Sequence, residues 1–259
     1  MRGGVAAVAA LGVAVAVFLS SASTFAQDES GALQPRHHVE YESPQHFDIE
    51  IRFAPYTPHI DYDPSLNGTP YRDTFGSMAR LEVAAEFDWQ AVRIPHLGTI
   101  GPGVAAGYTS MSAPAPFKNP PPNSPPSVET TSLDIFPFYA VLVLRADVVE
   151  KELHIPLVPY VKGGVGYALW RAYNDGGTSE SAAGVAGKGH TWGSQVAAGV
   201  SLDLNVFDLT AARDFDNSLG VNHTYFFAEY MRSTLTGLGQ AHALYVGTDT
   251  FAMGLAFAF

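Results

Sequence analysis

Large apolar side chains alternate with polar or small ones along several segments of the chain. The alternation is plainest in residues 46–54, where Phe47, Ile49, Ile51 and Phe53 alternate with Asp48, Glu50 and Arg52. A period of two places successive side chains on opposite faces of a β-strand. This segment is therefore predicted to be a strand with one apolar and one charged face.

The same pattern predicts seven further strands, in residues 77–90, 97–111, 132–147, 156–170, 191–204, 221–231 and 248–259. No segment after residue 46 gives a convincing long helix. The second strand is apolar on one face and carries Arg80, Glu82, Glu86 and Asp88 on the other. In the last strand, large side chains alternate with Ala and Gly alone, at Phe251, Met253, Leu255, Phe257 and Phe259.

The connections between these strands alternate in length. Long ones rich in Pro, Gly, Asn, Asp and Ser occupy residues 55–76, 113–131, 171–190 and 233–244, whereas those at 91–96 and 147–152 are short. Only the connection after the sixth strand departs from this rule. An even number of strands with short turns at one end and long loops at the other is typical of outer-membrane barrels.

A soluble β-sandwich also contains many alternating strands. It would need more charge on its edge strands to prevent edge-to-edge pairing, and it would not need such unequal loops. The sequence therefore favours an all-β fold, an eight-stranded antiparallel transmembrane β-barrel of the outer-membrane type over residues 46–259.

The composition agrees with this fold. The 259 residues are 47% hydrophobic and only 15% charged, against about 25% charged in typical soluble domains. The net charge of −11 argues against a nucleic-acid partner, which is bound through Lys and Arg. Since there is no cysteine, disulfides and thiolate metal sites are excluded.

The N-terminus is predicted to direct export. Arg2 precedes an apolar run over residues 5–19, and Thr24 and Ala26 flank Phe25 as a small-x-small cleavage site. This arrangement is typical of a secretory signal peptide, here residues 1–26. The polar residues 27–45 are then a periplasmic N-terminal segment before the barrel.

The signal, the alternating strands from Phe47 onward and the final strand together resemble the eight-stranded outer-membrane β-barrel proteins of the OmpA and OmpX type. In that family the last strand ends on an aromatic residue, usually Phe, which the barrel-assembly machinery reads. The resemblance implies a place in the bacterial outer membrane, in contact with its lipid. It also implies an assembly signal formed by Phe251, Met253, Leu255, Phe257 and Phe259.

Closure of the barrel predicts a charged interior. The last strand must pair with the first, because a membrane barrel has no open edge. Ala and Gly on the inner face of the last strand then leave space for Asp48, Glu50 and Arg52, in an interior just wide enough for side chains. The expected ion-paired network consists of Asp48, Glu50, Arg52, Arg80, Glu82, Glu86, Asp88, Lys162 and Glu229.

The outer face needs aromatic side chains near both membrane interfaces. The candidates for these girdles are Phe47, Phe53, Trp89, Tyr108, Trp170, Trp192 and Phe259.

The favoured function is a non-enzymatic membrane protein that acts structurally or through its long external loops, with a filled lumen. One alternative is a narrow, cation-preferring pore through the charged interior. Another is a lipid A acyl-chain hydrolase or transferase, since such barrel enzymes use a His, a hydroxyl and a carboxylate, here His223, Thr224 and Glu229. Thr224 points away from the other two, so no catalytic residue is predicted, and no cofactor or metal.

An oxygen-rich stretch of the first long loop has the ligand types of a calcium site. Asp61, Asp63, Asn67 and Asp73 supply suitable ligand oxygens, but their spacing does not match an EF-hand. These residues are therefore expected to be solvated turn residues.

Overall fold

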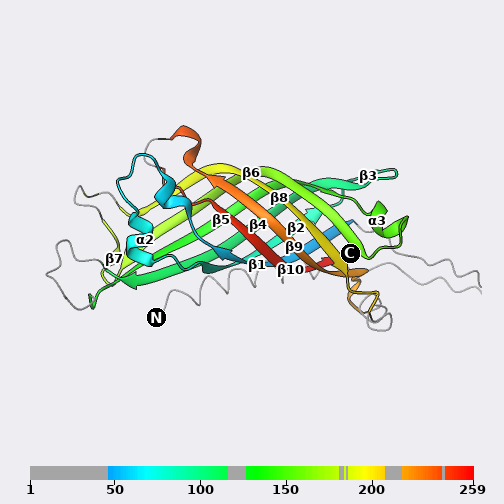
Figure 1. Cartoon of the computed structure of the whole chain (residues 1–259), viewed down its shortest axis with the longest axis horizontal. Helices are drawn as coiled ribbons and strands as arrows, with labels where there is room; N and C mark the ends of the chain where they lie inside the picture. Colours follow the sequence, from blue (N-terminus) through cyan, green and yellow to red (C-terminus); the bar gives the residue numbers. More distant parts are fainter. Residues whose placement is uncertain (1–45, 116–126, 181–183, 185, 208–217, 241–242) are drawn as a thin grey trace, which may run out of the picture. The chain divides into compact units, whose positions relative to one another are not determined.

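The computed structural model describes residues 46–115, 127–180, 184, 186–207, 218–240 and 243–259 (Figure 1). The predicted signal peptide (residues 1–26) and the N-terminal segment (residues 27–45) lie outside these residues. Across the described ranges, no helix is both long enough and apolar enough to span a membrane.

Eight long strands form where the alternation predicts them. They are β1 (Phe47–Tyr56), β2 (Arg80–Trp89), β4 (Gly98–Pro114), β5 (Thr130–Arg145), β6 (Leu157–Asn174), β8 (Lys188–Asp203), β9 (His223–Leu235) and β10 (Thr248–Ala258). Two short strands were not predicted: β3 (Val92–Ile94) pairs with β4, and β7 (Gly177–Thr178) pairs with β6. Both extend hairpins at the ends of the barrel (Figure 1).

The sheet closes on itself. Its strand order is β2-β1-β10-β9-β8-β6-β5-β4, every neighbouring pair is antiparallel, and β4 pairs back to β2. In the closing pair, Asp48 lies opposite Ala258, Glu50 opposite Ala256, and Arg52 opposite Gly254. The backbone N–H groups of His46 and Phe47 donate to the carbonyl of Phe259 at 2.8 and 3.2 Å. The prediction of a closed eight-stranded barrel is confirmed.

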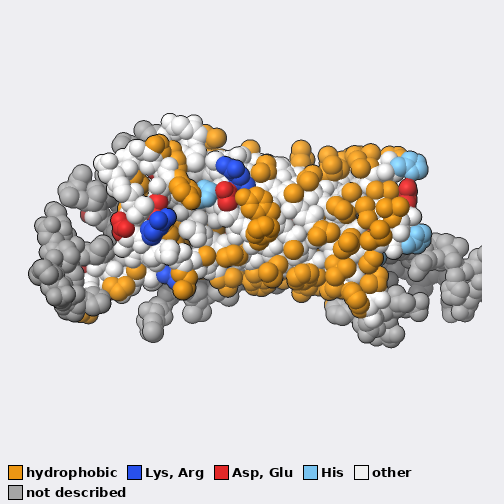
Figure 2. Space-filling view, in the orientation of Figure 1, with side chains coloured by type: hydrophobic (Ala, Val, Ile, Leu, Met, Phe, Trp, Pro, Cys, Tyr) orange, Lys and Arg blue, Asp and Glu red, His pale blue; other side chains and the backbone are white. Residues whose placement is uncertain are grey.

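The two faces of the strands are those that the sequence predicts. Glu50 and Arg52 are at most 2% exposed inside the barrel, whereas Phe47 and Phe53 on the same strand are 43% and 44% exposed outside. Figure 2 shows hydrophobic side chains spread over the barrel wall between its two ends. On β1, β2 and β10 the apolar rows therefore face outward, and the charged or small rows face the lumen.

The lumen is layered along its length. Along β6, Val158 and Tyr160 belong to a small apolar cluster, Lys162 follows, and Ala168 belongs to a larger apolar cluster. The same order recurs along β9, where Glu229 lies between the two clusters. A charged layer therefore separates two apolar layers.

Short helices lie in the connections. The 3₁₀-helix η1 (His59–Tyr62) and α2 (Pro70–Phe75) lie between β1 and β2, η2 (Gly237–Gly239) follows β9, and α3 (Val148–Lys151) lies between β5 and β6. The end of the barrel with α2, β7 and η2 is called the long-loop end, and the end with α3 and Phe259 the short-turn end (Figure 1).

The acidic residues of the first long loop serve local turns. The carboxylate of Asp61 accepts hydrogen bonds from the backbone N–H groups of Tyr71 at 2.7 Å and Arg72 at 3.0 Å, at the first turn of α2. Asp63 accepts from the N–H and hydroxyl of Ser65 at 2.8 and 2.7 Å. Asp61 and Asp63 thus cap turns within the loop, which agrees with the turn interpretation.

One girdle prediction is wrong. Trp170 lies on the inward-facing row of β6, in phase with Tyr160 and Lys162, and packs against the larger apolar cluster of the lumen. The alternation of β6 continues through Gly163 and Gly164, so an even-numbered residue faces inward. Trp89 and Trp192 are 50% and 43% exposed on the outer face.

The tight closing pair predicts a stability difference between two glycines. A Cβ at position 254 would lie 1.9 Å from the backbone oxygen of Ile51, whereas a Cβ at Gly163 would meet nothing within 4 Å. Gly254→Ala is expected to lower the free energy of unfolding by about 1–3 kcal/mol, the usual cost of overpacking. Gly163→Ala is expected to change it by no more than about 0.5 kcal/mol.

Urea unfolding in detergent micelles, followed by heat-modifiable migration in SDS, measures both variants. Equal midpoints for the two variants would contradict the tight packing at the closing pair.

Candidate functional site

The charged layer is centred on Lys162. Its ammonium lies 2.6 Å from Oε2 of Glu50, 2.7 Å from Oε1 of Glu86 and 3.7 Å from Oε2 of Glu229. Lys162 is 3% exposed, and the three carboxylates are equally buried. One cation thus joins β6 to β1, β2 and β9 across the lumen.

Arg52 provides a second set of bridges. Its guanidinium donates to Glu86, and its Nε lies 3.2 Å from Oε1 of Glu229. The hydroxyl of Tyr160 donates to the other oxygen of Glu229 at 2.9 Å. Because Glu86 and Glu229 each contact both Arg52 and Lys162, the bridges form one connected network.

Arg145 is a central member that the sequence analysis missed. Its Nη1 lies 3.0 Å from Asp48, and its Nη2 lies 2.9 Å from Glu50 and 2.6 Å from Asp88. The odd-numbered residues of β5 face inward from Leu133 onward, and Arg145 continues this row. The sequence did not reveal that Arg145 faces inward, because residues 141–144 are apolar on both faces of the strand.

Two predicted members lie apart from these bridges. Arg80, at the long-loop end of β2, donates to the backbone carbonyl of Phe75 at 3.2 Å and does not join the charged layer. Glu82 is 2% exposed beside the layer, and its Oε2 has no hydrogen-bond partner among the described residues. We use "lumen network" below for the buried charged residues of this layer, with Glu82 and Arg145 included and Arg80 left out: Asp48, Glu50, Arg52, Glu82, Glu86, Asp88, Arg145, Lys162 and Glu229.

The lumen network has more acids than bases. It contains six carboxylates and three cations, so its formal charge is −3 when every group is ionised. Removing any one of the three cations leaves several buried carboxylates without their partner, which is far more costly than losing a surface pair.

A small hollow lies beside the lumen network. It has a volume of about 20 Å³, and its lining includes Asp48, Arg145, Val158, Ser201 and Tyr225. This volume is enough for about one water molecule. The charged layer and the two apolar clusters thus follow one another along the barrel axis.

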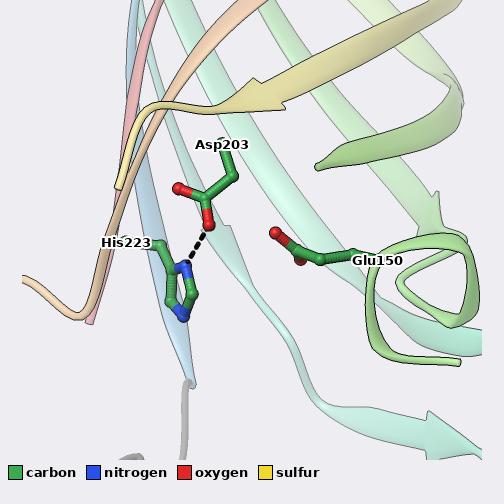
Figure 3. A group of neighbouring side chains, drawn as sticks. All are labelled: Glu150, Asp203 and His223. Carbon is green, nitrogen blue, oxygen red and sulfur yellow. Dashed lines mark hydrogen bonds and ion pairs between the residues drawn. The ribbon is translucent and has the colours of Figure 1, made fainter. Parts of the chain in front are cut away.

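A second group of side chains lies at the short-turn end. Glu150 of α3, Asp203 at the end of β8 and His223 at the start of β9 point toward one another (Figure 3). Nδ1 of His223 lies 2.9 Å from Oδ2 of Asp203, and one ligand atom from each of the three residues lies within 4.8 Å of the others. We call these residues the rim triad.

Burial and the adjacent Asp203 raise the pKa of Glu150 to about 7. The hydroxyl of Tyr225 donates to Oε2 of Glu150 at 3.4 Å. Two carboxylates in contact need a shared proton or a cation between them. The rim triad is therefore suited to holding a proton or a cation between its two carboxylates.

The candidate catalytic residues of the lipid A hypothesis do not meet. His223 lies opposite Ala258 and Glu229 opposite Ala252, so about 20 Å of strand separates them at about 3.4 Å per residue. His223 contacts Asp203 at the rim, while Glu229 belongs to the lumen network. Thr224 lies on the opposite strand face. These residues form no triad for acyl-chain chemistry.

No protein-family model and no curated protein matches the sequence. Similar solved structures include Ail, the attachment invasion locus protein of Yersinia pestis, in complex with the heparin analogue sucrose octasulfate (10% identity, 83% of this chain, 97% of that chain, TM-score 0.40). Neisserial surface protein A is also similar (15% identity, 84% of this chain, 98% of that chain, TM-score 0.41). So is the N-terminal β-barrel domain of Pseudomonas aeruginosa OprF (10% identity, 83% of this chain, 99% of that chain, TM-score 0.36). The fold assignment, and with it the resemblance to eight-stranded barrels, rests on the strand pairing described above.

The buried position of Lys162 predicts a large effect of its removal. Lys162→Met leaves Glu50, Glu86 and Glu229 without this cation, and is expected to lower the free energy of unfolding by about 3–5 kcal/mol. The matched control is Lys151→Met, because Lys151 is 41% exposed and pairs with Asp147 at 3.2 Å. Its loss is expected to cost about 0–1 kcal/mol.

Urea midpoints in detergent micelles compare these two lysine variants. A Lys162→Met barrel as stable as the Lys151→Met barrel would show that Lys162 is not needed to balance the carboxylates.

Proposed function

We propose that this protein is a bacterial outer-membrane barrel that acts as a non-conducting scaffold for its external loops. The observation that carries the proposal is the order of layers in the lumen, where a paired charged layer lies between two apolar clusters. A barrel of this kind has no path for solutes along its axis, so its role lies at its ends.

The outer wall supports a place in lipid. Every long strand presents exposed apolar side chains, among them Ile51, Val104, Leu142, Val161 and Val196 at 41–60% exposure. A bilayer gives no water to backbone N–H and C=O groups, and the closed sheet satisfies them internally. The resemblance of the final strand to an assembly signal ending in Phe259 supports insertion by the barrel-assembly machinery.

The long-loop end supports a surface role because hydrogen bonds join two of its segments. The backbone N–H of His59 donates to the carbonyl of Gly247 at 2.8 Å, and the hydroxyl of Tyr56 donates to the carbonyl of Val246. These bonds hold the start of the first loop against the segment before β10. A hollow of about 200 Å³ lies there, with Asp61 and Arg72 in its lining. A fixed surface of mixed charge is suited to contact with an external partner.

One observation favours the alternative of a narrow pore. The lumen network carries a formal excess of three negative charges, which would select cations if the layer opened. The two functions differ in conductance.

The proposed location predicts which end of the barrel faces the exterior. The chain has no cysteine, so single cysteines can be placed at two exposed positions, Asn67→Cys at the long-loop end and Leu153→Cys at the short-turn end. A maleimide reagent too large to cross the outer membrane is expected to label position 67 in intact bacteria. Position 153 is expected to react only after the membrane is permeabilised; the reverse result would overturn the orientation.

The filled lumen predicts the absence of channels. Heat-modifiable, folded protein reconstituted in planar bilayers is expected to give no conductance steps in potassium chloride, since side chains occupy the axis. A cation-selective porin inserted in the same bilayers is the positive control. Reproducible steps from this protein, with a reversal potential that shows cation preference, would reject the scaffold and favour the pore.

A further inference from the structure

We infer that the rim triad of Glu150, Asp203 and His223 binds a divalent transition-metal cation such as Zn²⁺ at the short-turn end of the barrel. This site is separate from the lumen network and from the long loops that the proposed function uses.

The three residues come from separate elements that converge at the rim. Figure 3 shows the Glu150 carboxylate, carried by the α3 segment, facing the Asp203–His223 pair. Zinc bonds nitrogen and carboxylate oxygen at about 2.0–2.2 Å, so tetrahedral ligand atoms lie about 3.4 Å apart. The triad has 2.9 Å between His223 and Asp203 and at most 4.8 Å between any two ligand atoms. Small side-chain movements suffice to complete the coordination.

The second oxygen of each carboxylate is already held. Oδ1 of Asp203 accepts the backbone N–H of Asn205 at 2.8 Å, and Oε2 of Glu150 accepts the hydroxyl of Tyr225 at 3.4 Å. The remaining oxygens are Oδ2 of Asp203 and Oε1 of Glu150. Outer hydrogen bonds of this kind orient carboxylate ligands in metal sites.

The remaining oxygen of Glu150, next to the Asp203 carboxyl, lacks a cationic partner among the described residues. Oε1 of Glu150 is buried from solvent and has no hydrogen-bond partner among the described residues. In the same part of the chain, neither Glu150 nor Asp203 forms an ion pair with a lysine or arginine, since Lys151 and Arg93 both pair with Asp147. A cation bound by the triad would satisfy this oxygen and separate the two carboxylates.

The ligand types indicate the class of cation. One imidazole and two carboxylates suit zinc and neighbouring first-row metals better than calcium or magnesium, which prefer oxygen alone. Three protein ligands leave a further coordination position for water or an external group. Bound metal would also join α3 to the ends of β8 and β9.

The lumen offers a contrast within the same chain. Glu50, Glu86 and Asp88 also bring three carboxylates within 4.8 Å of one another. However, Lys162 and Arg145 already lie among them at 2.6–2.9 Å. Of these two clusters, the rim triad has no lysine or arginine ion-paired to its carboxylates within the described ranges.

Zinc titration of the folded full-length protein in detergent micelles tests the inference. Calorimetry is expected to show one saturable site per chain that His223→Ala weakens at least tenfold. The matched control is His96→Ala, since His96 forms an exposed pair with Glu152 at 3.0 Å, and no described residue adds a third ligand. This control is expected to leave the affinity unchanged.

A spectroscopic measurement identifies the ligands directly. Co²⁺ in place of Zn²⁺ is expected to give the visible absorption of a four- or five-coordinate site, and Glu150→Gln or Asp203→Asn should weaken or change that spectrum. Heat-modifiable migration confirms that each variant is folded, and Glu150→Gln serves if His223→Ala does not fold. Absence of saturable binding, or binding that survives all three substitutions at the triad, would overturn the inference.

Discussion

The pairing of β1 with β10 is the constraint on which the rest of the structure depends. In a bilayer an unpaired strand edge is too costly to persist, because no water reaches its N–H and C=O groups. The first and last strands of the sheet must therefore meet, and they do so from Asp48 opposite Ala258 to Phe53 opposite Met253. Once this register is set, every inward-facing side chain of the two strands has a fixed neighbour.

This register explains how so many charges fit inside a narrow barrel. Ala258, Ala256 and Gly254 lie opposite Asp48, Glu50 and Arg52, so the small side chains of one strand leave room for the long ones of the next. A slip by one residue would turn the charged row of β1 toward lipid. Buried ion pairs add little net stability compared with well-packed apolar residues, so we infer that these pairs act mainly by disfavouring such alternative registers.

Much of the fold could be predicted from the sequence because successive side chains of a barrel strand face lipid and lumen in turn. This alternation appears in the sequence as a period of two. The inward positions of Glu50, Glu86 and Glu229 follow from that period alone. Arg145 was missed where β5 is apolar on both faces, and Trp170 was assigned to the wrong face although the phase of β6 places it inside.

The rim triad could not be predicted because alternation carries no information about what meets at the ends of strands. Glu150, Asp203 and His223 are brought together by the position of α3 and by the pairing of β8 with β9. Sequence reasoning instead linked His223 to Glu229, which shares its strand face but lies in another layer of the lumen. The alternation did not show how far apart His223 and Glu229 lie along the barrel axis.

The lumen network and the rim triad use similar residues under different conditions, and the difference decides where chemistry is available. In the lumen, the carboxylates contact Arg52, Arg145 and Lys162, so their binding capacity is taken up by the chain itself and serves to hold strands together. At the rim, Glu150 and Asp203 have His223 but no lysine or arginine partner among the described residues. The ion pairs of the lumen network therefore account for its carboxylates structurally, and the binding roles proposed above are assigned to the two ends of the barrel.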